Sequence, residues 1–194
     1  MHDYYDPSPR LSLPRPILLA GQIGAGTRLI ARSLCARTGL PFVDVDRKIE
    51  HEAGASLDQI GNEHGPGRIG HWARQIVERH TIQRPWSIIV LDRAWPSSEI
   101  GSLLRRKIDF VHIQRTPDFL LPRIRKEVQA AGPWLVNGLA DCLERAEDLK
   151  PILDRRTPLL TEAGILLDAG NQHELGVAHI VQDSLESVSQ ASAF

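Results

Sequence analysis

Short apolar runs alternate with longer amphipathic stretches along most of the chain. The apolar runs, which are typical of buried strands, lie at residues 17–20, 42–44, 87–91, 110–113 and 165–168. The stretches with helical spacing lie at residues 27–38, 47–53, 56–63, 70–80, 98–106, 117–130, 141–155 and 174–188. Strands that alternate with helices favour a parallel sheet with right-handed crossover connections. The pattern therefore predicts an α/β fold.

The length of the chain suits one compact domain with a buried core, since 194 residues are too few for two comfortable domains. The first residues differ from the rest because Pro7, Pro9 and Pro14 lie among polar residues there. Such composition is typical of a disordered or loosely docked arm. We therefore expect an arm over residues 1–15 and a single domain over residues 16–194.

The charge balance gives no sign of nucleic acid as a partner. The formal net charge is −1, whereas nucleic-acid-binding domains usually carry a basic patch or stripe. The longest apolar run is far shorter than the roughly 18–20 residues that span a membrane, and the N-terminus lacks a signal-peptide core. Cys35 and Cys142 are too few for a disulfide framework. We expect a cytoplasmic protein that binds neither nucleic acid nor membrane.

A glycine-rich turn joins the first predicted strand to the first predicted helix. Gly21 and Gly26 have the spacing of the phosphate-binding motif G-x-x-x-x-G-K-[ST], and Gly24 lies between them. In such a turn, N–H groups and the positive end of a helix hold an anion. Thr27 and Arg28 take the places of the lysine and the hydroxyl residue. The turn thus predicts an anion cradle that lacks the cation and metal ligand of phosphoryl transfer.

Arg28 leaves two interpretations open. A cation in the first turn of a helix is disfavoured by roughly 0.3–1 kcal/mol unless an anion offsets it. Arg28 could therefore stand in for the missing lysine and face a bound anion. The other interpretation is a solvated surface arginine with no role in binding.

Three aspartates follow predicted strands at the edge where open α/β sheets bind their ligands. Asp44 and Asp46 form a D-x-D motif at the end of one strand, and Asp92 follows another. Many phosphate-loop proteins place a magnesium-side carboxylate at the position of Asp92. Structural roles are the alternatives, because Asp46 could cap the next helix and Asp92 could pair with Arg93 or cap a loop.

These features, in this order, resemble the shikimate kinases, small phosphate-loop enzymes that phosphorylate shikimate with ATP in aromatic amino-acid synthesis. The resemblance covers roughly residues 16–188. It rests on Gly24-Ala25-Gly26, Pro41-Phe42-Val43-Asp44-Val45-Asp46, Gly54-Ala55-Ser56-Leu57-Asp58-Gln59-Ile60 and Arg156-Thr157-Pro158-Leu159. It implies a three-layer sandwich with a five-stranded parallel sheet, and the use of ATP with magnesium.

The resemblance also implies roles for individual residues. Asp44 would contribute to the magnesium site, and Asp46 would be the catalytic residue that accepts a hydrogen bond from the substrate hydroxyl. Arg156 would bind the shikimate carboxylate, for which a planar guanidinium is well suited; a structural ion pair is the alternative. Gly70 takes the place of the family's second carboxylate-binding arginine, with Arg68 as an imperfect neighbour.

The sequence supports three hypotheses about function. The leading one is a degenerate shikimate-kinase-like protein, a pseudokinase that binds a small anionic metabolite or regulates a protein partner. It follows from the loss of the loop lysine, of the family's lid arginine and of its glycines after the third strand, which also weakens the case for ATP and magnesium. The second hypothesis is an active small-molecule kinase that uses Arg28 and Asp92. The third is a pure interaction module whose pocket is filled by Trp95 and Trp134.

Overall fold

The computed structural model describes residues 15–83, 87–94, 107–131, 135, 143–161 and 163–191. Its strands are β1 (Ile17–Gly21), β2 (Phe42–Asp44), β3 (Ile88–Leu91), β4 (Asp109–Gln114) and β5 (Ile165–Asp168). Its helices are α1 (Thr27–Thr38), α2 (Val45–Ala53), α3 (Leu57–His64), α4 (Pro66–Gln83), α6 (Pro117–Ala131), the 3-10 helix η4 (Ala146–Leu149), α7 (Lys150–Leu160) and α8 (Glu174–Ala191).

The strands form one parallel sheet of five strands in the order β2-β3-β1-β4-β5. The central strand β1 pairs with β3 on one side and with β4 on the other, so that Ile17 is opposite both Ile88 and Asp109. The predicted α/β fold with a five-stranded parallel sheet is confirmed. Because β1 is central, the loop that follows it lies in the middle of the carboxyl edge of the sheet.

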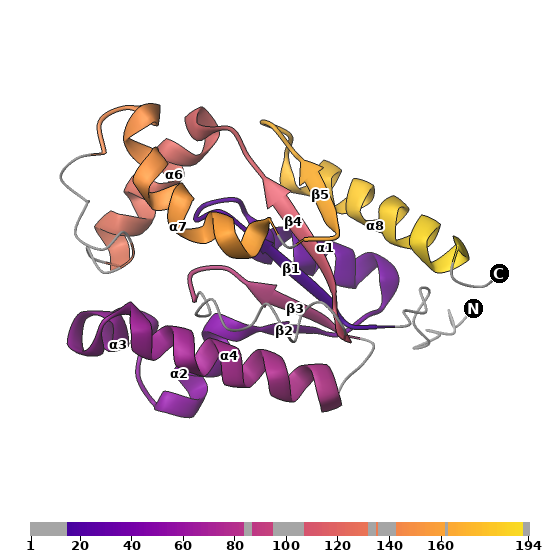
Figure 1. Cartoon of the computed structure of the whole chain (residues 1–194), viewed down its shortest axis with the longest axis horizontal. Helices are drawn as coiled ribbons and strands as arrows, with labels where there is room; N and C mark the ends of the chain where they lie inside the picture. The colour runs from indigo at the N-terminus through magenta and orange to yellow at the C-terminus, as the bar shows by residue number, and fades with distance from the viewer. Residues whose placement is uncertain are drawn as a thin grey trace, which may run out of the picture.

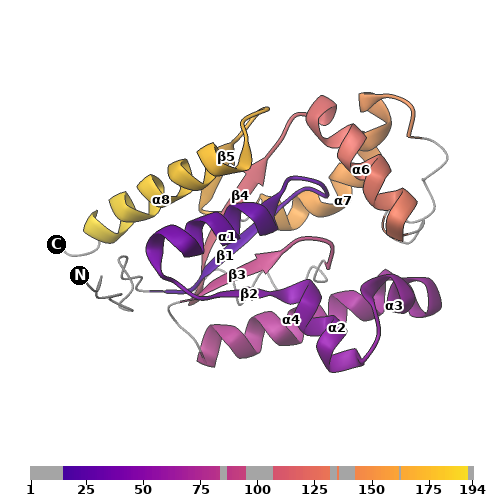
Figure 2. The same cartoon turned by 180° about the vertical axis from the view of Figure 1, so that it is seen from behind.

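Helices cover both faces of the sheet and give it three layers. Leu18 and Ala20 of β1 belong to an apolar cluster shared with α2, α3, α4, α6 and α7. Ile17 and Leu19 point to the other face, where they pack with α1 and α8. Figure 1 and Figure 2, seen from opposite sides, both place α1 beside α8. Because both faces of β1 are buried, every residue along the strand is apolar or small, and the sequence shows a continuous apolar run there.

Two helices begin elsewhere than the sequence indicated. The helix predicted at residues 70–80 already begins at Pro66, because proline is favoured in the first turn of a helix, where its missing N–H costs nothing. The helix predicted at 141–155 begins at Lys150, with Pro151 in its first turn, and a short 3-10 helix precedes it. Pro66 and Pro151 thus lie in the first turns of these two helices.

The D-x-D motif lies across the boundary between β2 and α2. Asp44 is the last residue of β2 and the N-cap of α2, and its Oδ1 accepts the Arg47 N–H at 3.3 Å. The alternative in which Asp46 caps this helix is therefore wrong. Asp46 lies in the first turn of α2 and does not cap the helix.

The predicted arm at residues 1–15 lies outside the described residues apart from its last residue, and so does the helix predicted at 98–106. Within the described part of the chain, no helix combines the length and the apolar character needed to cross a membrane.

Candidate functional site

The loop between β1 and α1 has a backbone conformation that glycine adopts most readily. Gly24 and Gly26 have φ angles of 79° and 81°, in the left-handed region. Gly21 has no space for a side chain, since a Cβ atom there would lie 2.9 Å from the Ile113 carbonyl oxygen. Gly26 is also the N-cap of α1. These three glycines therefore shape the strand-to-helix turn that the motif predicted.

The loop presents several N–H groups at the N-terminus of α1. The Ala25 N–H is used within the turn, where it donates to the Gln22 carbonyl at 3.0 Å. Among the described residues, the N–H groups of residues 26–28 donate to no main-chain carbonyl. Such N–H groups, together with the positive end of the helix dipole, favour the binding of an anion. This geometry supports the predicted anion cradle.

A pocket of about 690 Å³ opens beside the loop, and we call it the loop pocket. Loop residues, the helices α1, α2 and α6, and the first residue of α8 line it. Its basic side chains are Arg28, Arg32, Arg47, Arg123 and Lys126, and its acidic side chains are Asp92, Glu127 and Glu174. Basic side chains outnumber acidic ones in this lining by five to three, although Asp44 and Asp46, which do not line the pocket, offset part of the charge of Arg28. A negatively charged ligand is therefore favoured there.

Thr27, at the position of the motif's lysine, has a short and fully buried side chain. Its hydroxyl donates to the Leu91 carbonyl and to Asp92 Oδ1, both at 3.4 Å. The side chain thus joins α1 to the end of β3. It brings no positive charge to the loop.

Arg28 places its guanidinium among the three predicted aspartates. Its Nε lies 2.7 Å from Asp44 Oδ2, and its NH2 lies 2.8 Å from Asp46 Oδ2 and 3.6 Å from Asp92 Oδ2. The arginine side chain is 27% exposed and that of Asp46 is 1% exposed. Arg28 is therefore not the solvated surface arginine of the alternative interpretation. The structure brings these four predicted site residues together, and we call them the Arg28 cluster.

A second arginine contacts Asp46 from the loop after β3. Arg93 Nε lies 3.6 Å from Asp46 Oδ2, and its NH1 lies 2.9 Å from Asp58 Oδ1. The N–H groups of Arg93 and Ala94 also donate to Asp46, at 3.1 and 2.9 Å. Asp46 is therefore surrounded by hydrogen-bond donors, and the loop after β3 supplies Arg93 as its charged partner.

The charged groups of the Arg28 cluster shift each other's pKa values. Burial, together with the neighbouring Asp92, raises the pKa of Asp46 to about 6. Burial also raises the pKa of Asp92, while Arg28 and Arg156 act to lower it. Burial lowers the pKa of Arg28, but the three aspartates outweigh that effect and leave its pKa above the ordinary value. The guanidinium is thus a permanent cation between acids that would otherwise repel one another.

The three aspartates do not fit a magnesium ion while Arg28 lies among them. Magnesium requires near-octahedral oxygen ligands at about 2.0–2.1 Å, and the guanidinium already contacts an oxygen of each aspartate. In the described ranges, no group of three or more His, Cys, Asp or Glu side chains is arranged to hold a metal ion. The motif's serine or threonine, whose hydroxyl would be a metal ligand, is replaced here by Arg28. The predicted metal roles of Asp44 and Asp92 therefore stay predictions.

The two arginines predicted to bind substrate lie in different surroundings. Arg156 is buried, and its guanidinium donates to the carbonyls of Gly21, Asp92 and Arg93 at 3.2, 2.7 and 3.1 Å. Arg68 is exposed in the first turn of α4, with its guanidinium over the ring of Trp72. Arg156 thus ties the glycine loop to the loop after β3. Binding of a substrate carboxylate by either arginine stays a prediction.

Sequence reasoning missed two charged groups that hold the loop pocket in shape. Arg115 follows β4 and is almost fully buried, with its guanidinium donating to the Ala25 and Ala169 carbonyls at 3.2 and 3.3 Å. Arg123 on α6 pairs with Glu174 at the start of α8. An arginine directly after a core strand, at the ligand edge of the sheet, is the signal that could have identified Arg115. Trp95 and Trp134, on which the interaction-module hypothesis rests, lie outside the described residues.

The five-stranded sheet and the glycine turn before α1 define a P-loop kinase fold. A sequence model of the family named shikimate kinase matches residues 23–187. The chain belongs to the shikimate kinase family.

Several proteins of this family are similar to the chain along most of its length. It is 30% identical to a shikimate kinase of Zymomonas mobilis over 147 residues, which cover 76% of this chain and 81% of that protein. It is 28% identical to a shikimate kinase of Mannheimia succiniciproducens over 87% of this chain and 94% of that protein. The solved structure of shikimate kinase from Acinetobacter baumannii in complex with shikimate has the same fold, with a TM-score of 0.71, 20% identity and coverage of 91% and 94%.

Proposed function

We propose that this protein binds a small anionic metabolite in the loop pocket and transfers phosphate poorly or not at all. The observation that carries the proposal is the Arg28 cluster, in which a side-chain cation lies among Asp44, Asp46 and Asp92. The family implies ATP and magnesium as cofactors. In this chain, however, the guanidinium takes up the carboxylates that would otherwise be available to the metal.

The argument against efficient transfer rests on charge. Phosphoryl transfer needs fixed cations where negative charge develops, and a single transition-state arginine can be worth roughly 10³–10⁵ in rate. Thr27 supplies no charge, and the charge of Arg28 is shared among three carboxylates. Since about 1.36 kcal/mol corresponds to a factor of ten in rate, these losses together leave little turnover.

The argument for binding rests on the loop pocket. The N–H groups of residues 26–28, which donate to no main-chain carbonyl of the described residues, and the basic side chains of the lining both favour a ligand with phosphate or carboxylate groups. ATP and ADP are candidate ligands through their phosphates, which N–H groups can hold without the motif's lysine. Regulation of a protein partner stays a prediction for which these contacts supply no support.

Thermal unfolding with pyrophosphate, ADP and shikimate, each with and without magnesium chloride, tests the proposal. We expect pyrophosphate or ADP to raise Tm equally in the presence and absence of the metal. A ligand at 100 times its Kd adds about 2.7 kcal/mol to the free energy of unfolding, which is easily measured. Absence of a saturable shift with all three compounds would contradict anion binding.

Restoring the family's residues gives a sharper test. In the double variant Thr27→Lys with Arg28→Ser, the loop regains a cation and a hydroxyl, and the aspartates lose their internal partner. We expect ADP affinity to rise about tenfold or more and to become dependent on magnesium. Arg32→Ser is the matched control, because Arg32 is exposed on the same helix and lines the same pocket. Unchanged ADP affinity in the double variant would mean that the loop does not hold phosphate in this register.

The second candidate function is an active, ATP-dependent shikimate kinase, and the comparisons favour it over impaired transfer because the curated relatives are named shikimate kinase. In this case Arg28 would replace the lysine, Asp92 would be a metal carboxylate, and Asp46 would accept the hydrogen bond of the substrate hydroxyl. A carboxylate whose pKa is raised to about 6 is well placed to accept a proton near neutral pH.

Shikimate-dependent release of ADP from ATP separates the two candidates. Impaired transfer predicts a turnover far below the value of about 10 s⁻¹ that is typical of enzymes. A turnover near that value, abolished in Asp46→Asn, would establish the active kinase and refute impaired transfer. Anion binding in the thermal experiment would remain valid in either case.

A further inference from the structure

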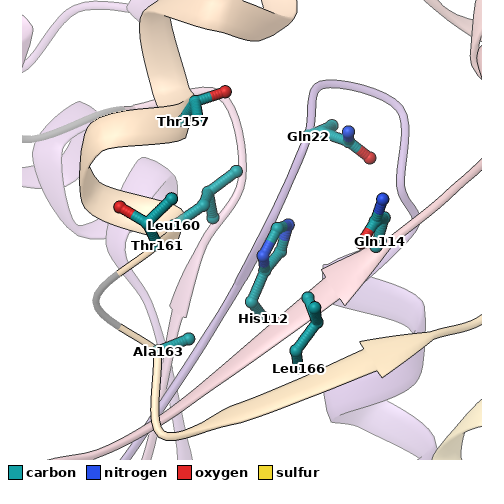
Figure 3. Close-up of a pocket in the computed structure, with 8 residues that line it drawn as sticks. All are labelled: Gln22, His112, Gln114, Thr157, Leu160, Thr161, Ala163 and Leu166. Atoms are coloured by element: carbon teal, nitrogen blue, oxygen red, sulfur yellow. The ribbon is translucent and has the colours of Figure 1, made fainter.

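A second pocket, of about 400 Å³, lies between α7 and the strands β4 and β5 (Figure 3), and we call it the α7 pocket. It shares no lining residue with the loop pocket. Its polar side chains come from three parts of the fold: Gln22 from the glycine loop, His112 and Gln114 from β4, and Thr157 and Thr161 from α7 and the residue after it. None of the residues predicted from the sequence to form a site lies in it.

His112 has a buried ring nitrogen, Nε2, that lacks a hydrogen-bond partner among the described residues. Figure 3 shows its imidazole rising from β4 into the space between α7 and the loop that carries Gln22. The residue is 8% exposed, and within the described chain its Nε2 has no hydrogen-bond partner. A buried polar atom without a partner destabilises the fold, and a ligand that supplies the partner removes that cost. Burial also lowers the pKa of His112 to about 4, so the ring is neutral at physiological pH.

The other polar side chains have capacity left for a ligand. Gln22 Oε1 accepts the Arg115 N–H at 3.0 Å, which leaves its NH2 group as a donor. The hydroxyls of Thr157 and Thr161 donate to the carbonyls of Leu153 and Pro158, at 3.1 and 3.0 Å. Their oxygen lone pairs remain available as acceptors. The pocket therefore offers donors and acceptors close together.

The remaining lining is apolar and uncharged. Leu160 and Leu166 lie on opposite sides of the imidazole in Figure 3, and Ala163 lies near the mouth. No charged side chain is found among the described residues that line the pocket. Helix α7 ends at Leu160, so the negative end of its dipole faces this region. An ionised ligand would have no partner here, and an anion would be repelled.

We propose that the α7 pocket binds an uncharged, flat small molecule with neighbouring hydrogen-bond donors and acceptors at its edge, such as a carboxamide or a pyrimidine-type heterocycle. The leucines would cover its faces, and His112, Gln22 and the threonine hydroxyls would satisfy its edge. Because Nε2 is itself covered, a ligand can contact it only after a neighbouring side chain rotates. This site is independent of the function proposed for the loop pocket.

Nuclear magnetic resonance with assigned His112 side-chain resonances tests this proposal, with nicotinamide and uracil as probes. We expect a saturable shift of the His112 imidazole with at least one probe. Nicotinate, which has a similar ring and a negative charge, is expected to bind at least about fivefold more weakly than nicotinamide. Thr161→Val, which removes one acceptor, is expected to weaken the bound probe about fivefold.

Two leucines give a matched pair of variants. Leu166→Arg places a cation at the pocket, whereas Leu175→Arg places one on α8, and the wild-type side chains are 60% and 59% exposed. We expect Leu166→Arg to weaken the bound probe about fivefold or more and Leu175→Arg to change its affinity less than about twofold. Three results would each overturn the proposal: no saturable shift of His112 with either probe, equal effects of the two variants, or equal affinities of nicotinate and nicotinamide.

Discussion

Arg28 sets the charge balance of the candidate site, because its guanidinium contacts three aspartates, two at the junction of β2 and α2 and one in the loop after β3. The loss of a nearby cation is costly for a buried acid, whereas it costs little for an exposed one. Asp44 and Asp46 are 8% and 1% exposed, and Asp92 is 19% exposed, so all three belong mainly to the first case.

Arg28→Met keeps the length of the side chain and removes its charge. We expect the free energy of unfolding to fall by about 1–3 kcal/mol, less than for a fully buried pair because Arg28 is 27% exposed. Magnesium chloride at millimolar concentration should restore part of this loss, since the freed aspartates become available to a divalent cation. Urea unfolding with and without the metal measures both effects. Arg32→Met serves as the control, and a loss of equal size there would show that the Arg28 cluster has no special role.

His112 gives the protein a predictable dependence on pH. Its pKa is lowered to about 4 by burial, so between pH 6.5 and 4 the unfolded chain binds a proton at this site that the folded protein does not. Stability therefore falls as the pH falls through this window, by about 2 kcal/mol at pH 5 for this residue alone. Other groups titrate too, and a comparison of variants isolates the histidine.

The comparison uses His112→Gln and His71→Gln, the latter at an exposed histidine of α4. Chemical unfolding at pH 7 and pH 5 should show a smaller loss of stability on acidification in His112→Gln than in the wild-type protein. His71→Gln should behave like the wild-type protein. Identical losses in the three proteins would mean that His112 titrates alike in the folded and unfolded states.

Among the elements, the start of α1 is the most constrained. Gly26 is its N-cap with φ 81°, and a Cβ atom there would lie 2.8 Å from Glu174 Oε1. Gly54 at the end of α2 has a similar φ of 66° but nothing within 4 Å of such an atom. The two glycines thus separate backbone strain from steric contact between α1 and α8.

We expect Gly26→Ala to lower the free energy of unfolding by about 2–3 kcal/mol and Gly54→Ala by about 1 kcal/mol. The difference arises because Glu174 is buried and held by Arg123, so it cannot move aside cheaply. Gly26→Ala should also weaken pyrophosphate binding, while Gly54→Ala should not. Urea unfolding and the thermal pyrophosphate titration provide the measurements. Equal losses of stability would indicate that Glu174 yields freely.

The elements were predictable where local pattern alone decides them. The apolar runs of β1 and β3 and the glycines that bound α1 gave these elements nearly correct ends. The starts of α4 and α7 were missed because proline can either interrupt a helix or occupy its first turn, and the sequence pattern does not show which. In this fold Pro66 and Pro151 both occupy first turns. Asp46 was the alternative considered for the cap of α2, but Asp44 fills it, and the two residues could not be told apart by side chain because both are aspartates at the end of the strand.

For the whole molecule, the loop pocket joins segments that are far apart in the sequence. Its basic residues come from α1, α2 and α6, and Glu174 comes from α8. A ligand bound there should be held partly by long-range attraction, which salt screens: the Debye length falls from about 10 Å to about 3 Å between 0.1 and 1 M. We expect the Kd of pyrophosphate to rise several-fold over this range. Calorimetric titration at several salt concentrations measures it.

Two substitutions refine the salt experiment. Lys126→Gln removes a charge that lines the pocket, and Arg79→Gln removes one on α4, where its partner is Glu52. The first should reduce both the affinity and its dependence on salt, and the second should change neither. A Kd that does not vary with salt in the wild-type protein would contradict an electrostatic binding mode.

The candidate site was predictable residue by residue but not as a set of contacts. Gly21, Gly24 and Gly26 follow from a local motif, and their conformation can be inferred from spacing alone. The partners of Arg28 could not be inferred this way, because Asp92 lies 64 residues away and meets it only when β1 and β3 pair. The buried contacts of Arg156 depend likewise on the fold bringing three segments together.

The position of Arg28 has a consequence for how this protein responds to its surroundings. A cation carried by a side chain is present at a fixed ratio of one per molecule, whatever the supply of free divalent ions. The positive charge at this edge of the sheet is thus fixed by the sequence and does not depend on the concentration of divalent ions. In the proposed function, such a protein binds its metabolite when divalent ions are scarce, whereas a metal-dependent homologue does not.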